Sequence, residues 1–162
     1  MLIAIAVLIV LGATGALAQE IDKTTIKVTA SSWELKANGG YGDMPPERSL
    51  DGDLKTAWMA EGDGVWIQYD FGSVKPLSAV KLAFFKGNER VYTFDILVSQ
   101  TGEDKSWTVV GDKLKSSGTT NELESYPFNP VQAHYVRIVG HGNTSQGFAK
   151  WCNVAEAAFV SK

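Results

Sequence analysis

The sequence contains one cysteine, Cys152, among 162 residues. A single thiol cannot form an intrachain disulfide, so the fold must be held by its core. Basic residues are also few: 15 Lys and Arg stand against 18 Asp and Glu, which gives a net charge of −3. Proteins that bind nucleic acid without sequence preference need a basic surface, and this balance argues against that class.

Recognisable catalytic motifs are lacking as well. There are only two histidines, His134 and His141, and neither lies in a known catalytic pattern. The sequence has no G-x-S-x-G, no H-E-x-x-H and no phosphate-binding loop. A lone cysteine at a strand end, as we expect Cys152 to be, is more often an inert buried residue than a nucleophile. A small polysaccharide lyase or hydrolase is therefore the least favoured class, because it needs a general acid–base pair.

The N-terminal segment carries no charge before Glu20, and residues 2–18 are almost entirely apolar. This run ends in Ala16-x-Ala18, the small-x-small pattern that precedes signal-peptide cleavage. We predict that residues 1–18 are a signal peptide and that the protein is secreted, extracellular or periplasmic. No Lys or Arg precedes the apolar run, so a retained membrane anchor or assembly helix is the alternative. Contact with a membrane or between copies of the chain is expected only in that case.

Residues 19–162 show no sustained helical periodicity. Short apolar or alternating runs are instead separated by Gly, Asn, Asp, Ser and Pro. These runs are Val65–Phe71, Leu77–Phe85, Phe94–Val98, Trp107–Val110, Leu123–Phe128, His134–Val139 and Val154–Val160. Their spacing predicts a single all-β domain, an antiparallel sandwich or barrel.

A short acidic segment, Asp51-Gly52-Asp53, precedes Thr56. Calcium prefers several oxygen ligands, and a tight turn supplies them from side chains and carbonyls together. Gly52 permits such a turn. Taken alone, the segment is more often a plain turn, and both interpretations stay open at this level.

Two polar segments, residues 86–92 and 140–145, follow strand-like runs, where binding residues are often found. Either segment is equally well explained as a solvated connection. Five tryptophans are present, and exposed indole rings stack on sugar faces. Those near loops or strand ends are Trp33, Trp58 and Trp151, whereas Trp66 and Trp107 lie in strand patterns. Any one of them taken alone is more often a core residue.

The order and spacing of several segments resemble the discoidin family, also called the coagulation factor V/VIII C-type domain. The bacterial form of this family is the family 32 carbohydrate-binding module. The resemblance extends from about Ile26 to Val160 and implies an antiparallel eight-stranded jelly-roll β-sandwich. The segments that carry it are Ser49–Asp53, Thr56–Trp58, Trp66–Gly72, Phe94–Ser99, Trp107, His134–Ile138 and Ala155–Glu156.

The resemblance also implies a structural calcium ion close to the ligand-binding end. Its side-chain ligands in this sequence would be Asp51, Thr56 and Glu156. Carbonyl oxygens would come from Arg48, Asp53, Thr56 and Ala155. Because Glu156 is remote in sequence from the other ligands, the ion would tie the C-terminal strand to an early loop.

The segments 83–90 and 137–143 are similar to modules attached to alginate lyases, which implies an acidic polysaccharide such as a polyuronate. Arg and Lys side chains pair with uronate carboxylates. The ligand-binding residues that this resemblance implies are Tyr41, Lys86, Asn88, Arg90, His141, Asn143 and Trp151. The Lys150-Trp151-Cys152 segment departs from the commonest family pattern, which leaves the shape of that rim open.

The sequence is therefore interpreted as a non-catalytic carbohydrate-binding protein with a structural calcium and a glycan partner. The alternative is a surface adhesion or structural assembly protein, anchored by its N-terminal apolar helix.

Overall fold

The computed structural model describes residues 18–35 and 42–162, and most regular structure there is β-strand. Its strands are β1 (Gln19–Glu20), β2 (Lys27–Ala30), β3 (Trp58–Glu61), β4 (Val65–Ala83), β5 (Tyr92–Ser99), β6 (Thr108–Lys115), β7 (Glu124–Asn143), β8 (Trp151–Val154) and β9 (Glu156–Ser161). Two short 3-10 helices are η1 (Lys23–Thr25) and η3 (Pro46–Leu50). Within the described ranges, no helix has the length and apolar character needed to cross a membrane.

The two long strands, β4 and β7, belong to both layers of a sandwich. In one layer the first half of β4 pairs with β2 and with the second half of β7, and β5 and β6 follow. In the other layer the second half of β4 pairs with the first half of β7 and with β9, to which β1 adds. All of these pairings are antiparallel, so the expected all-β antiparallel sandwich is confirmed.

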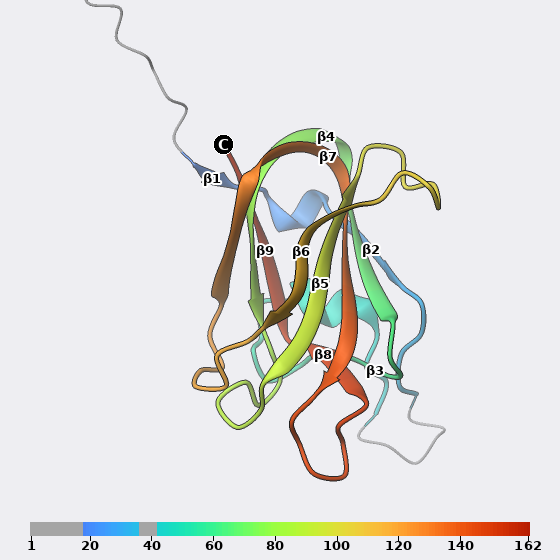
Figure 1. The fold of residues 1–162 in the computed structure, drawn as a ribbon, viewed down its shortest axis with the longest axis vertical. Coiled ribbons are helices and arrows are strands. Elements are labelled where there is room, and N and C mark those ends of the chain that lie inside the picture. The colour runs from blue at the N-terminus through green and yellow to red at the C-terminus, as the bar shows by residue number, and fades with distance from the viewer. Residues whose placement is uncertain (1–17, 36–41) are drawn as a thin grey trace, which may run out of the picture.

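The two long strands bend together at one end of the sandwich, which we call the arch end (Figure 1). The register of β4 slips between Asp70 and Lys75, and Gly72 within this bend has a φ of 70°. Glycine enters this left-handed region without strain, so the bend falls where the sequence allows it. The sequence pattern predicts a strand on either side of Gly72, and the structure joins the two into one.

The core lies between the layers and is rich in aromatic side chains. Tyr69 and Phe71 of one layer lie 4.8 and 5.1 Å, between ring centroids, from Phe159 of the other. Phe94 meets Tyr126 edge-on across the same gap at 5.0 Å. Such tilted and edge-to-face pairs stabilise the packing beyond the effect of burial alone.

The outer face of the sheet carries a stack of one arginine between two tryptophans. The Arg137 guanidinium carbon lies 4.2 Å from the centroid of the Trp66 ring and 4.1 Å from that of Trp107. The same guanidinium donates from Nε and Nη2 to the Gln68 side-chain oxygen, at 3.2 and 2.7 Å. The two tryptophans in strand patterns therefore lie on the sheet surface, where they hold neighbouring strands together.

Trp58 is the core residue that a single tryptophan more often is, although it lies near a strand end. It is 1% exposed, and its indole N–H donates to the Ser32 carbonyl at 2.9 Å. Since β3 is covered on both faces, Trp58 is a core residue and offers no surface to a sugar. Trp33, by contrast, is 42% exposed.

The end opposite the arch holds the short β3–β8 sheet and several long loops, whereas β1 and the C-terminus lie at the arch end (Figure 1). A small second cluster of buried side chains packs at this loop end, apart from the main core. Its buried members are Met44, Ala57, Met59, Ala83 and Ala155, with Leu54, Phe85 and Trp151 packed against them. The cluster places two candidate binding regions next to each other.

Candidate functional site

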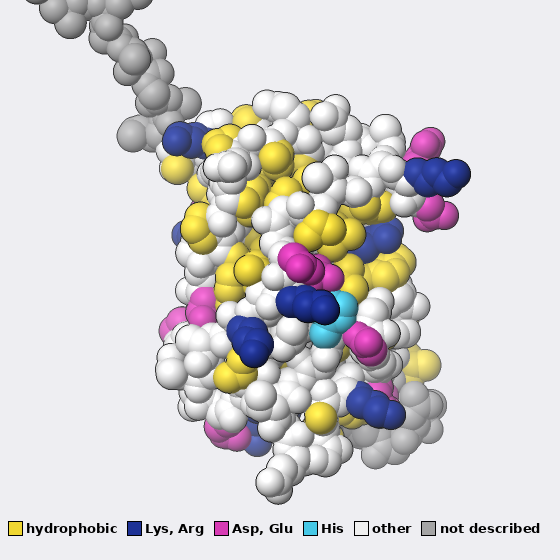
Figure 2. Space-filling model, viewed as in Figure 1, with side chains coloured by type: hydrophobic (Ala, Val, Ile, Leu, Met, Phe, Trp, Pro, Cys, Tyr) yellow, Lys and Arg dark blue, Asp and Glu magenta, His cyan; other side chains and the backbone are white. Residues whose placement is uncertain are grey.

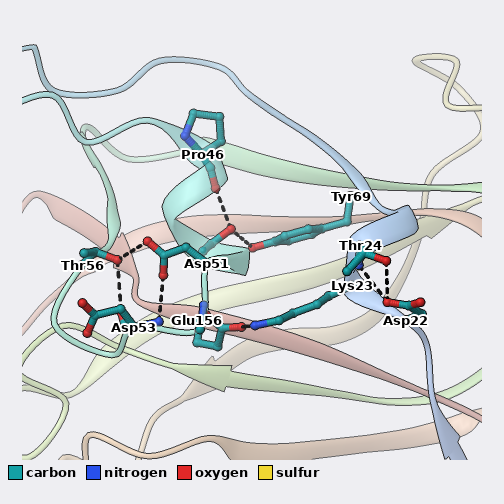
Figure 3. Close-up of polar contacts among 11 residues, drawn as sticks. Asp22, Lys23, Thr24, Pro46, Asp51, Asp53, Thr56, Tyr69 and Glu156 are labelled. Carbon is teal, nitrogen blue, oxygen red and sulfur yellow. Dashed lines mark hydrogen bonds and ion pairs between the residues drawn. The ribbon is translucent and has the colours of Figure 1, made fainter.

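The first region is a turn of oxygen donors over residues 51–56, directly after η3, which we call the oxygen turn (Figure 3). The Thr56 hydroxyl donates to Asp51 Oδ2 at 2.6 Å and contacts the Asp53 carbonyl at 3.0 Å. Asp51 Oδ1 also accepts from the Asp53 N–H at 2.8 Å. Gly52 has a φ of 81°, which the turn requires. Two of the predicted oxygen donors, Asp51 and the Asp53 carbonyl, therefore lie within a hydrogen bond of the Thr56 hydroxyl, which is itself the third predicted donor.

Glu156, at the start of β9, brings a fourth oxygen donor to this turn. Glu156 is 6% exposed, and its Oε2 accepts from the Gly52 N–H at 2.9 Å. Its Oε1 accepts from the Lys23 ammonium, also at 2.9 Å. A buried carboxylate is unfavourable without partners, and these two donors supply them. The predicted meeting of the C-terminal strand with the acidic turn is therefore present.

The remaining predicted metal donors are the main-chain carbonyls of Arg48, Thr56 and Ala155. Arg48 lies in η3, and the fully buried Ala155 donates its N–H to the Ala83 carbonyl at 2.8 Å. The candidate set contains only oxygen, which suits a hard cation such as calcium. Among the described residues, no group of three or more His, Cys, Asp or Glu side chains could hold a metal. A metal here would therefore depend on the hydroxyl and the carbonyls as much as on carboxylates.

The second region consists of two loops, residues 84–91 and 143–151, which we call the paired loops. Two hydrogen bonds join them at their bases. The Val91 N–H donates to Thr144 Oγ1 at 3.0 Å, and the Thr144 N–H donates to the Val91 carbonyl at 3.1 Å. The two sets of predicted ligand residues, separated by about fifty positions, thus lie on neighbouring loops.

Three of the predicted ligand residues, Lys86, Asn88 and Arg90, are on the first of these loops. Lys86 and Asn88 are exposed and Arg90 is half-buried. Lys86 has a φ of 54°, a region that residues other than glycine seldom enter, and such strain is often found at functional sites. The Arg90 guanidinium lies 5.9 Å from the centroid of the Phe148 ring, on the second loop.

His141 lies at the base of the second loop, with both ring nitrogens engaged. Nδ1 contacts Asp63 at 2.7 Å and Nε2 contacts Asp95 at 2.9 Å. Burial lowers the pKa of His141, but the hydrogen bonds and charges of Asp95 and Asp63 outweigh it and raise the pKa above its usual value. Figure 2 shows a histidine with basic and acidic side chains close by on one face. His141 therefore acts first as a clamp that joins β7 to β5 and to the turn between β3 and β4.

Asn143 also has internal partners. Its amide nitrogen donates to the carbonyls of Phe148 and Trp151, both at 2.8 Å, and its side-chain oxygen accepts from the Ser145 N–H at 2.8 Å. This side chain therefore shapes the second loop. Direct ligand contact by His141 or Asn143 stays a prediction, and the geometry gives each of them a bracing role.

Two ligand candidates of the second loop were missed by the sequence reasoning, Phe148 and Lys150. Phe148 is 47% exposed and Lys150 is exposed, whereas the predicted Trp151 is half-buried against the small cluster. The sequence signal that could have identified them is the position of an aromatic and a basic residue close to Trp151. Tyr41, also predicted to contact the ligand, lies outside the described residues, as does most of the predicted signal peptide.

Cys152 shows none of the features of a nucleophile. It is 3% exposed, and its sulfur accepts from the Gly142 N–H at 3.2 Å. Burial raises the pKa of the Cys152 thiol to about 11, so the reactive thiolate is scarce at neutral pH.

Comparison with known proteins identifies the family. The F5/8 type C domain profile matches residues 27–156. A solved CBM32 of AlyQ, in complex with 4,5-unsaturated mannuronic acid, is 36% identical, with 87% of this chain and 97% of that chain covered and a TM-score of 0.74. A pectin-binding carbohydrate-binding module is 28% identical, with 88% and 91% covered and a TM-score of 0.70.

A truncated AlyQ containing CBM32 and alginate lyase domains is 35% identical, with a TM-score of 0.76. The match covers 89% of this chain and 33% of that longer chain. No curated protein sequence matches the chain. The profile match covers most of the chain, and the resemblance seen in the sequence is confirmed. The chain belongs to the F5/8 type C domain family, with CBM32 modules among its relatives.

Proposed function

We propose that this protein is a non-catalytic carbohydrate-binding protein whose ligand is an acidic polysaccharide such as a polyuronate. One observation carries the proposal: the paired loops hold Arg90 against Phe148, with no described carboxylate at ion-pair distance from that guanidinium. Its support is a relative, 36% identical, that was solved in complex with an unsaturated mannuronic acid.

Each part of the paired loops suits a uronate chain. Arg90 presents planar N–H donors that pair with a carboxylate through two hydrogen bonds. Lys150 adds exposed positive charge on the second loop, and Lys86 adds it on the first, where its ammonium lies 3.6 Å from Glu89 Oε2. The exposed ring of Phe148 offers an apolar face to the C–H groups of a sugar. Such a shallow polar site must displace bound water, so we expect a dissociation constant of about 10⁻³ to 10⁻⁵ M.

The test is the double variant Lys86→Ala with Arg90→Ala, titrated with a polymannuronate oligomer and followed by calorimetry. Its matched control, Lys75→Ala with Lys105→Ala, removes the same charge at the arch end. We expect binding at least about tenfold weaker in the first variant, equivalent to about 1.4 kcal/mol, and unchanged in the control. Binding by the wild type should also weaken as salt rises, since salt screens exposed charges. Equal weakening in both double variants, or none in either, would contradict the assignment.

Calcium at the oxygen turn is the second part of the proposal. Asp51, Thr56 and Glu156 would supply side-chain oxygens, and the carbonyls of Arg48, Asp53, Thr56 and Ala155 would complete the shell. The all-oxygen donor set of the turn supports this assignment. A bound calcium would stabilise the folded state by mass action and would join β9 to the turn after η3.

Absence of catalysis rests on the chemistry of the candidate groups. His141 has both nitrogens engaged by carboxylates, and Cys152 is a buried thiol, so neither is arranged to exchange a proton with, or attack, a substrate. The proposal also includes export through residues 1–18, which would bring the protein to polysaccharides outside the cell. N-terminal sequencing of the exported protein tests this: a start at Gln19 supports it, and a start at Met1 supports the anchored adhesion alternative.

A further inference from the structure

Lys23 lies at the oxygen turn although no metal-binding pattern in the sequence includes it. Its ammonium is 2.9 Å from Glu156 Oε1, and the Lys23 side chain is 42% exposed while that of Glu156 is 8% exposed (Figure 3). The two residues are 133 positions apart. Lys23 is thus the cation that neutralises the buried carboxylate proposed as a calcium ligand.

The local structure holds this ammonium in place. Asp22 caps η1 by accepting from the Thr24 N–H at 3.0 Å and from the Thr24 hydroxyl at 2.8 Å. The turn then directs Lys23 across the acidic segment. A Cβ added to Gly52 would lie 3.0 Å from the Lys23 nitrogen, so the ammonium rests directly against the backbone of the oxygen turn. Glu156, by its other oxygen, binds the Gly52 N–H of that same backbone.

We propose that Lys23 is an internal competitor of calcium: its ammonium neutralises Glu156 when the site holds no metal, and weakens calcium binding when metal is present. This inference rests on the calcium assignment above. Two cations that share one carboxylate repel each other, and the repulsion is strong where water is scarce. Without either cation, the buried carboxylate would be left with a single N–H donor, which destabilises the fold. Lys23 therefore makes the domain tolerant of low calcium at the expense of calcium affinity.

The test compares Lys23→Met with Lys27→Met, a nearby exposed lysine on β2 that serves as the control. Calcium chloride is titrated into chelator-treated protein by calorimetry, and melting is recorded with calcium and with chelator. For Lys23→Met we expect calcium to bind at least about threefold more tightly and the melting temperature in chelator to fall. The rise in melting temperature on adding calcium should then exceed that of the wild type. Lys27→Met should have the calcium affinity and melting temperature of the wild type. Lys23→Arg keeps the charge, so both quantities should stay close to those of the wild type.

The outcomes separate this inference from the calcium assignment. Calcium binding by the wild type with equal or weaker binding by Lys23→Met would overturn the competitor role and leave the calcium site standing. Binding by Lys23→Met alone would support the role in its strongest form, with the ammonium replacing the metal. No binding by either protein would overturn the calcium assignment and the competitor role together.

Discussion

Removal of the Arg137 guanidinium should destabilise the domain. The Arg137 side chain lies between two indole rings, those of Trp66 and Trp107, and binds the Gln68 amide oxygen. It thereby joins β4, β7 and the segment that enters β6. Arg137→Met keeps most of the apolar stem between the rings and removes the charge and its hydrogen bonds.

The expected loss follows from these contacts. A cation over an aromatic ring contributes about 0.5–1 kcal/mol at an exposed site and about 2 kcal/mol when desolvated. Two such contacts on a half-buried group, with about 1 kcal/mol for the bond to Gln68, give a loss of about 2–4 kcal/mol. For a domain of this size, each kcal/mol lowers the melting temperature by about 2–4 °C.

Urea unfolding of the wild type and of Arg137→Met measures this loss as a lower midpoint with an unchanged slope. Lys105→Met is the control, because exposed lysines on loops contribute within about 0.5 kcal/mol. Arg137→Lys should fall between, since an ammonium can contact one ring but cannot lie flat between two. If Arg137→Met lowers the free energy of unfolding by less than about 0.5 kcal/mol, the reasoning is wrong and the stack does not stabilise the fold.

Two further predictions concern metal and pH. Excess chelator should lower the melting temperature of the wild type, because calcium at one hundred times its dissociation constant would contribute about 2.7 kcal/mol; an unchanged melting curve would argue against calcium at Asp51 and Glu156. The raised pKa of His141 should make stability depend on pH. Its contribution is full below the unfolded-state pKa of about 6.5 and is lost as the pH rises through the higher folded-state pKa. Urea unfolding from pH 5.5 to 9 should show this decline in the wild type and a flatter profile in His141→Gln; parallel profiles would argue against it.

The strands of the main sheet could be predicted because one face of each is buried. In the segment after Val65, the alternation placed Ile67, Tyr69 and Phe71 inward, and all three are buried. The same rule failed for β3 and β8, because Trp58 and its neighbours are buried on both faces and show no alternation. When a short strand is covered on both faces, its sequence shows no alternation of apolar and polar residues.

Local chemistry in the site was readable from the sequence, but its long-range partners were not. The Asp51-Gly52-Asp53 turn has the geometry that its residue types suggest. The role of Glu156 as a metal ligand was predicted only from family resemblance, and no pattern in the sequence predicts its ion pair with Lys23. Likewise, the sequence predicted a connecting segment at His141, whereas the structure places it inside β7, and its two carboxylate partners depend on how three separate segments pack.

The two candidate sites share a mechanical connection at the loop end of the sandwich. Glu156 is adjacent to Ala155, whose N–H bonds the Ala83 carbonyl at 2.8 Å, and Ala83 is the last residue of β4 before the first of the paired loops. Phe85, one residue before Lys86, packs on the same small cluster as Ala155. Close-packed interiors transmit displacement, so a change at Glu156 reaches the loop through neighbours in direct contact. The proposed calcium and glycan sites are thus joined by one small cluster of buried side chains and one main-chain hydrogen bond.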